Sequence, residues 1–350
     1  MSGTGGNVQV ATLSGDAKIL SDLGIEVFSL DSPPKSDGPD RYGANAKWIQ
    51  DGWGFTVSSQ DELMRCIGRI GTLQVGRRYV WRGVASYKWR VQSSLLRRMV
   101  IKEGLTSITE SDVRARERAL LREARRWGIN RELGGAATDQ QLLAVLQHHG
   151  GPTRLLDVTS NPMTALWFAC QKPDQSTSNR AGALMAFDVT NLPVLVTASH
   201  ELGQTFGAVA DPLGWHLEDA LKQSVTSGQP FLVQPSYPDP RMVAQEGLFL
   251  TGAVPDKVRV LAVDGLPLGL GAAAPGEDAL STLFDPLPRG KGRPSRLPFV
   301  VLIVPAAIKQ RMLRHLESTY NRHYRYLFPD VAGFVAALKA GQLDLSHESC

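Results

Sequence analysis

The stretch that decides the fold is QHHGGPTRLLDVTSNPMTALWFA, residues 147–169. It places two histidines, a Gly-Gly-Pro turn, an arginine, an aspartate and an Asn-Pro break between apolar segments. Buried polar groups cost free energy unless they are hydrogen bonded. The stretch therefore forms either a dense structural hydrogen-bond network or the lining of a site.

Local patterns around this stretch alternate between helix and strand. Helices are expected at 59–70, 111–127, 138–149, 161–169, 306–316 and 331–338. Strands are expected at 78–83, 155–159, 183–189, 247–251, 258–263 and 297–304. Because the elements follow no regular βαβ period, the sequence predicts an α+β fold with a central mixed or antiparallel sheet and flanking helices.

The composition is that of an ordinary globular protein. Of 350 residues, 43% are hydrophobic and 21% charged, and the net charge of +4 implies no strong attraction of the whole molecule to nucleic acid. Three cysteines without metal spacing indicate a reducing compartment. No apolar run approaches the ~20 residues of a membrane helix, so we expect a cytoplasmic protein with no membrane partner. There is no His-Glu-x-x-His or Cys-x-x-Cys motif, and no metal is expected.

The domain organisation is expected to be simple. Residues 1–45 are rich in Gly, Ser, Asp and Pro and are expected to form a mobile N-terminal arm. Residues 46–340 are expected to form one domain. Within it, 264–296 are rich in Gly, Pro and Ala and predict an irregular insertion.

Together with Tyr79-Val80-Trp81-Arg82-Gly83, the 147–169 stretch resembles the FRG domain family. That family has an aromatic-x-Arg-Gly signature, which here reads Trp-Arg-Gly, followed by a block that this chain matches nearly throughout. The resemblance extends to residues 244–249 and 327–330 and so covers about residues 50–340. The central block is specific, whereas the two later ones are short.

The order of the polar motifs is also similar to the plan of ADP-ribosyltransferases. In that plan an Arg holds the phosphates of NAD, a Ser-Thr-Ser motif braces the nicotinamide pocket, and a Glu bonds the ribose. The resemblance gives these roles to Arg82, to residues 157–160 and to Gln245-Glu246, although the middle motif here is Asp-Val-Thr-Ser and a Glu-x-Glu or Gln-x-Glu pair is absent. It implies an ADP-ribosyltransferase-like fold with NAD as substrate.

Two of the candidate groups admit a structural reading as well as a functional one. Arg82 before Gly83 could present its guanidinium to a phosphate while the glycine lets a ligand approach, or it could pair with Asp157. His148 and His149 could cap a helix end or hydrogen bond a ligand, with His149 as acid or base.

The polar positions that follow are also candidates. Asp157, Thr159 and Asn161 share one face of a short strand and its exit, and Asn161 also suits a helix cap. The Asp157 carboxylate beside Arg154 is either part of an ion pair or a site acid, and both residues are candidates for ligand binding.

The resemblance to ADP-ribosyltransferases implies an enzyme that binds NAD and transfers ADP-ribose to a macromolecular acceptor, as a bacterial toxin or defence effector, with Glu246, Gln245 and His149 as catalytic candidates. The main alternative is a non-catalytic domain that recognises a nucleotide, nucleic acid or protein. In that case the arginine-rich segment 114–126, otherwise a solvated helix face, would supply a phosphate-binding surface. A hydrolase using His149 and Asp157 as an acid/base pair is a third reading.

Overall fold

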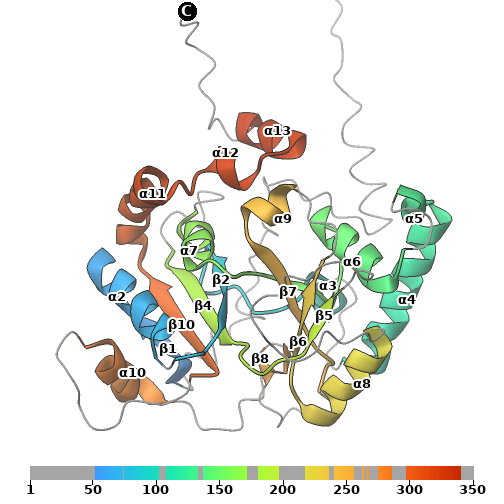
Figure 1. Cartoon of the computed structure of the whole chain (residues 1–350), viewed down its shortest axis with the longest axis horizontal. Coiled ribbons are helices and arrows are strands. Elements are labelled where there is room, and N and C mark those ends of the chain that lie inside the picture. Colours follow the sequence, from blue (N-terminus) through green and yellow to red (C-terminus); the bar gives the residue numbers. More distant parts are fainter. Residues whose placement is uncertain are drawn as a thin grey trace, which may run out of the picture.

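The computed structural model describes residues 52–73, 75–101, 108–132, 137–171, 180–196, 217–235, 240–255, 262–263, 266–267, 275–285 and 297–339. It confirms the α+β fold class, with one large mixed sheet and helices packed around it (Figure 1). The predicted N-terminal arm lies outside the described residues.

Eight described strands form the main sheet in the order β1-β10-β4-β2-β3-β7-β6-β5. The strands are β1 (Gly54–Thr56), β2 (Tyr79–Val84), β3 (Leu156–Thr159), β4 (Gly182–Asp188), β5 (Val194–Val196), β6 (Phe231–Gln234), β7 (Gly247–Thr251) and β10 (Phe299–Val304). The outer pairs β1–β10 and β5–β6 are parallel, and the inner pairs are antiparallel. A separate two-stranded pair consists of β8 (Ala262–Val263) and β9 (Leu266–Pro267).

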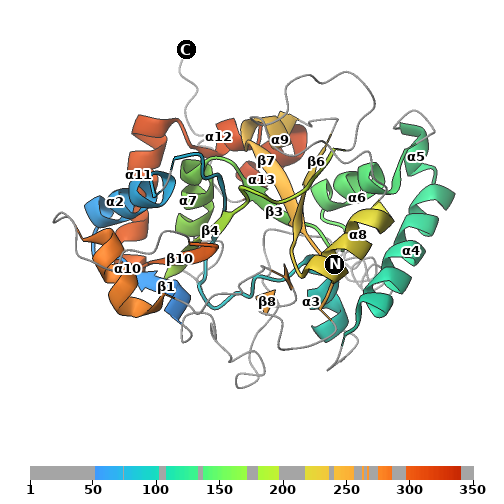
Figure 2. The ribbon, with the colours of Figure 1, turned by 60° about the horizontal axis from the view of Figure 1, so that its bottom comes forward.

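The described helices are α2 (Gln60–Gly71), α3 (Ser94–Ile101), α4 (Glu110–Arg126), α5 (Ile129–Glu132), α6 (Asp139–His148), α7 (Pro162–Cys170), α8 (Leu217–Ser227), α9 (Pro240–Ala244), α10 (Gly276–Phe284), α11 (Ala306–Tyr320), α12 (Tyr324–Leu327) and α13 (Val331–Lys339). In Figures 1 and 2, α2, α10 and α11 lie at one edge of the molecule, and α4, α5 and α8 lie at the opposite edge.

Alternation along the strands divides the core between the two sheet faces. On one face, Trp81 of β2 joins the cluster beneath α2, α7 and α11, while Phe249 of β7 joins a second cluster beneath α4, α6 and α8. The opposite face carries residues such as Val80, Val158 and Leu248, which form a third cluster. Two separate groups of described helices therefore cover the first face, and β3 lies between them.

Local sequence signals explain several helix starts. Ser59, Thr138 and Asn161 each accept hydrogen bonds from main-chain N–H groups of the first turn, as expected of N-cap residues. Helix α4 begins earlier than predicted, because Thr109 and Asp112 form a capping box. Helix α6 ends close to the predicted position. Its C-cap is His149, and Gly150 follows with a φ of 79°, a conformation that glycine adopts easily.

The close packing of α7 on β2 depends on a glycine. A Cβ atom added to Gly83 would lie 1.6 Å from the carbonyl oxygen of Ala165, so only glycine allows this approach. Tertiary packing of this kind also produces elements that local patterns did not predict: β1, β5, β6, α3, α5, α8, α9 and α12. Within the predicted irregular insertion 264–296, residues 276–284 are helical because Leu280, Leu283 and Phe284 pack into the core; most of the remaining insertion lies outside the described residues.

Candidate functional site: a cleft between α6 and α7

A cleft of about 300 Å³ lies between the two helix groups, lined by residues of α6 on one side and α7 on the other. Its floor includes residues that share one face of three neighbouring strands, namely Trp81, Gly83, Asp157, Thr159 and Gly247. Its walls come from α6, α7 and α9, with Phe328 beside them. The volume is at the lower end of that of small-molecule sites.

Arg82 lines the cleft and bridges two strands. Its Nη1 donates a hydrogen bond of 2.7 Å to the carbonyl oxygen of Asp157 and lies 3.8 Å from the Asp157 carboxylate. The ladder between β2 and β3 contains one residue pair, Trp81 with Thr159. The guanidinium therefore supplies a hydrogen-bond donor for the Asp157 carbonyl, which lies beyond that pair. Burial lowers the pKa of Arg82, and Asp157 partly opposes this. Arg82 thus ties the two strands together, and it is also among the residues that line the cleft.

The Asp157 carboxylate is exposed into the cleft and oriented by a second side chain. Gln147 Nε2 lies 3.0 Å from both Asp157 oxygens, and Thr153 Oγ1 donates a 2.6 Å hydrogen bond to Gln147 Oε1. The side chain of Asp157 is 60% exposed, so a ligand in the cleft can reach it. The chain of contacts holds the carboxylate in place before any ligand binds.

Thr159, Asn161 and Gln245 join the strand exit to the α9–β7 junction. Thr159 Oγ1 donates to the carbonyl oxygen of Gln245 at 2.7 Å and accepts from the Asn161 N–H at 3.0 Å. Gln245 Nε2 donates to the carbonyl of Leu327 at 3.0 Å. Thr159 and Gln245 line the cleft, whereas Asn161 acts as the cap of α7 and is not part of the lining.

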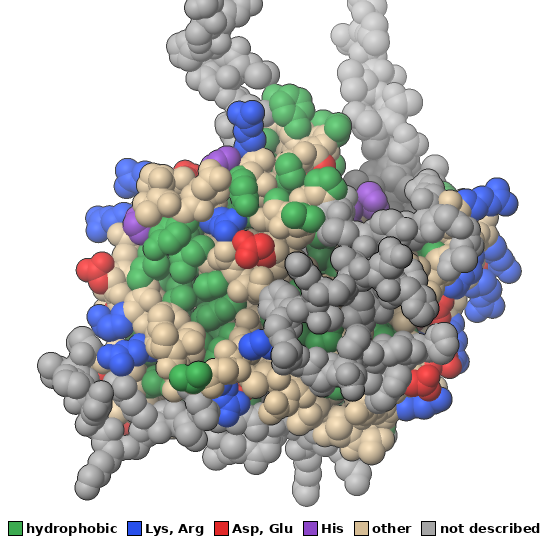
Figure 3. All heavy atoms as spheres, in the orientation of Figure 1, with side chains coloured by type: hydrophobic (Ala, Val, Ile, Leu, Met, Phe, Trp, Pro, Cys, Tyr) green, Lys and Arg blue, Asp and Glu red, His purple; other side chains and the backbone are tan. Residues whose placement is uncertain are grey.

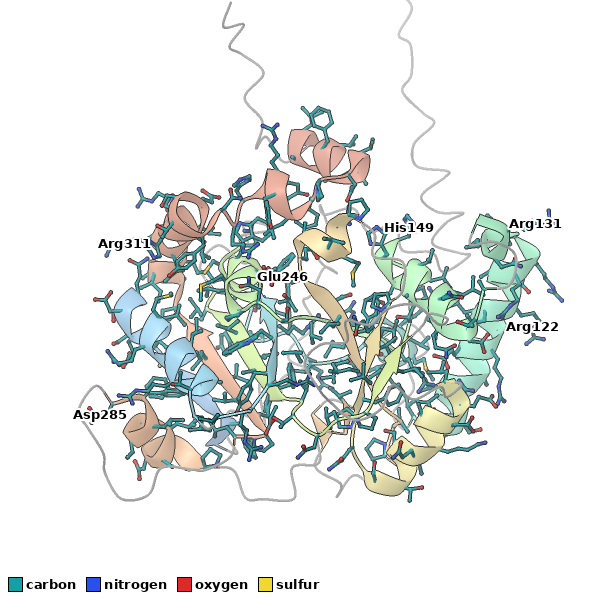
Figure 4. The ribbon with its side chains drawn as sticks, in the orientation of Figure 1. Arg122, Arg131, His149, Glu246, Asp285 and Arg311 are labelled. Carbon is teal, nitrogen blue, oxygen red and sulfur yellow. The ribbon has the colours of Figure 1, made fainter. Side chains whose placement is uncertain are left out.

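Glu246 lies behind this wall rather than in the cleft. Its Oε1 accepts hydrogen bonds from Asn161 Nδ2 at 2.8 Å and Arg322 Nη2 at 2.9 Å. Its backbone is in the left-handed region at φ 50°, a conformation that non-glycine residues rarely adopt. Figure 4 shows Glu246 between α7 and α9. As placed, Glu246 connects β3, β7 and the segment after α11.

The two histidines at the end of α6 lie in different environments. His148 lines the cleft, but His149 is exposed, is not part of the lining and caps α6 through its main-chain N–H. Figure 4 shows His149 on the other side of α9 from Glu246. The structure therefore does not bring the three catalytic candidates His149, Gln245 and Glu246 together, nor does it place His149 beside Asp157 as an acid/base pair.

Arg154 lies away from the cleft in a buried ion network. Its Nε is 2.7 Å from Glu117 Oε1 and its Nη1 is 3.0 Å from Glu110 Oε1, with Arg154 and Glu117 almost fully buried. Burial alone would lower the pKa of Arg154, but the two carboxylates outweigh it and raise the pKa. This side chain belongs to the packing of β3 against α4, because burial of a guanidinium requires paired carboxylates.

The cleft also contains groups that local sequence patterns did not single out. Arg241 pairs with Asp330 through two 2.8 Å contacts and lies 5.0 Å over the Phe328 ring. Thr164 is fully buried, and its Oγ1 has no hydrogen-bond partner within the described part of the chain. Thr164 and Phe328 lie inside the sequence blocks that resemble the FRG domain family. Arg241 lies outside these blocks, and no local pattern marks it, because only the fold brings it to Asp330.

Comparisons with known proteins identify one family. Residues 77–178 match the FRG domain, so the chain contains an FRG domain that includes β2, β3 and α7 of the cleft. No curated protein and no solved structure matches the chain. Across the described ranges, no group of three or more His, Cys, Asp or Glu side chains could hold a metal ion. Nor is any described helix long and apolar enough to cross a membrane.

Proposed function

We propose that this FRG domain protein binds NAD in the cleft and transfers its ADP-ribose to a macromolecule. One observation carries the proposal: Arg82, Thr159 and Gln245, far apart in the sequence, line a single cleft in the order of the ADP-ribosyltransferase plan. The cleft also supplies a carboxylate, Asp157, and aromatic surfaces from Trp81 and Phe328. A toxin or defence role would follow if the acceptor belongs to another organism.

The size of the cleft limits how the dinucleotide fits. About 300 Å³ accommodates the nicotinamide ribose end, and the adenosine end would extend outside it. We place the nicotinamide beside Phe328, and the phosphates toward the two cleft arginines, Arg82 and Arg241. The unpartnered Thr164 hydroxyl then bonds the ribose or the carboxamide.

The reaction breaks the bond between C1′ of the ribose and the ring nitrogen of nicotinamide. Nicotinamide leaves with the bonding electron pair, an acceptor nucleophile forms the new bond to C1′, and the acceptor loses a proton. Positive charge develops on the ribose, so a carboxylate nearby stabilises the transition state. We assign this role to Asp157 rather than Glu246, because Asp157 lines the cleft and Glu246 is held behind it by Asn161 and Arg322.

A second candidate function is non-catalytic recognition of a nucleotide, nucleic acid or protein in the same cleft. The observation that favours it is that both acidic side chains are already engaged: Asp157 by Gln147 and Glu246 by Asn161 and Arg322. A recognition domain needs such fixed polar groups and no reactive carboxylate.

The experiment that separates the two functions combines calorimetric titration of NAD with transfer of labelled ADP-ribose in cell extract. The transferase account predicts that Asp157→Asn binds NAD within about threefold of wild type but loses transfer by about 100-fold or more. Asp139→Asn, a carboxylate of α6 outside the cleft, serves as control and should change neither. Binding of NAD without transfer in the wild type supports recognition of a nucleotide, and absence of NAD binding rejects the transferase proposal.

A further inference from the structure

We infer that α4, Trp127 and α5 form a surface that binds single-stranded nucleic acid. We call this surface the arginine face. The inference does not depend on the proposed reaction, because the face is separate from the cleft.

Helix α4 divides its charged residues between two sides. Its buried side consists of Val113, Glu117, Leu121 and Ala124, and Glu117 is used by Arg154. Its exposed side carries Arg118, Arg122 and Arg126 at intervals of four residues. Such residues form a stripe along a helix with a step of about 6 Å. That regular row of guanidinium groups suits a chain of phosphates.

Ion pairs within the protein neutralise only part of this stripe. Arg118 pairs with Glu218 and Arg126 with Glu123, and both arginines stay more than 60% exposed. Exposed pairs of this kind are weak and easily exchanged for a phosphate. Arg122 and Arg131 form no ion pair with any described residue, and Figure 4 shows both pointing outward from the sheet. In Figure 3 the same edge of the molecule carries a dense group of basic side chains.

An exposed tryptophan lies at the end of the stripe. Trp127 is the C-cap of α4 and is 78% exposed, although tryptophan is usually well buried. Gly128, at φ 82°, turns the chain so that α5 and Arg131 follow directly. An aromatic ring beside arginines offers a stacking surface for an unpaired base.

The apolar content of the face argues for nucleic acid over other partners. Among residues 110–131, all of which the structure describes, Trp127 is the one large hydrophobic residue that is strongly exposed. A membrane-bound helix would present a continuous apolar face, and a protein interface would have an apolar centre. Because base stacking covers the faces of bases inside a duplex, the exposed ring favours a single strand.

The test measures fluorescence anisotropy of labelled oligonucleotides of about 20 residues, as single-stranded RNA, single-stranded DNA and a duplex. We expect either single strand to bind with strong salt dependence, and Arg122→Glu/Arg126→Glu to weaken binding by about tenfold or more and to reduce the salt slope. Trp127→Ala should weaken single-strand binding by about tenfold and duplex binding by less than about twofold.

The control is Arg311→Glu/Arg314→Glu on α11, which makes the same charge change at the opposite edge of the molecule (Figure 4). It should stay within about twofold of wild type. Equal loss in both double variants would assign binding to overall charge and overturn the inference. So would unchanged single-strand binding in Trp127→Ala, or no binding at about 50 mM salt.

Discussion

The guanidinium of Arg82 donates a 2.7 Å hydrogen bond to the main-chain carbonyl of Asp157, whose side chain opens into the cleft. One arginine thus fixes the residue that we assign to the transition state while lining the same cleft itself. Because Arg82 is 20% exposed, most of its side chain is held by the protein and only part of it faces a ligand. We therefore expect that loss of this contact would disturb both the geometry of the cleft and the binding of a ligand in it.

The hydroxyl of Thr164 gives a sharp test of whether the cleft takes a polar ligand. Thr164→Val removes a hydroxyl that has no partner among the described residues, so the free energy of unfolding should stay the same or rise slightly. NAD affinity should fall by about tenfold. The matched control is Thr251→Val, because its hydroxyl bonds the Arg154 carbonyl outside the cleft. That variant should lose about 1 kcal/mol of stability and keep its NAD affinity; the reverse pattern would argue against the ligand position.

The contact between β2 and α7 predicts an effect of a single methyl group. Gly83→Ala places a Cβ against the Ala165 carbonyl, so α7 must shift, and we expect a loss of about 3 kcal/mol or more in urea unfolding. Gly68→Ala, on α2, meets nothing within 4 Å and should raise stability by up to about 1 kcal/mol. Similar stability of the two variants would show that α7 does not lie on β2 as described.

The buried network around Arg154 predicts a loss of stability rather than of ligand binding. Arg154→Met removes one of the two arginines that pair with the buried Glu117 carboxylate, the other being Arg114, and should cost about 3 kcal/mol in chemical unfolding. Arg118→Met, which breaks an exposed pair, should cost less than about 1 kcal/mol. If the folded Arg154→Met protein bound NAD much more weakly than wild type, Arg154 would have to be assigned to the ligand-binding site.

The pair of Arg241 and Asp330 predicts a pH dependence. Hydrogen bonds from Arg241 hold the pKa of Asp330 below its usual range, so the folded state binds the proton less tightly than the unfolded state. This contribution is complete above the unfolded pKa, about 4, and is lost as the pH falls through the folded pKa. Thermal melting should show Asp330→Asn below wild type at pH 7, with the gap closing as the pH falls below about 4. A constant gap would contradict the assignment.

Local sequence patterns predicted the fold class and the strands that build the site, because capping residues such as Ser59 and Asn161 and the apolar strands act locally. They did not separate Arg154 from Asp157, which are three residues apart. A strand turns alternate residues to opposite faces, and only the packing of α4 decides which face is the core. The role of Glu246 was equally hidden, because Arg322 reaches it only in the folded chain.

The most direct test of the central claim is nicotinamide release from labelled NAD by purified protein, with and without cell extract. We predict release together with label transferred to a macromolecule. Arg82→Lys, which keeps the charge but loses the planar fork, should reduce release by at least about tenfold while remaining folded by thermal melting. The account would be contradicted if the wild type neither bound NAD nor released nicotinamide, or if Arg82→Lys and Arg82→Ala both turned over NAD at the wild-type rate.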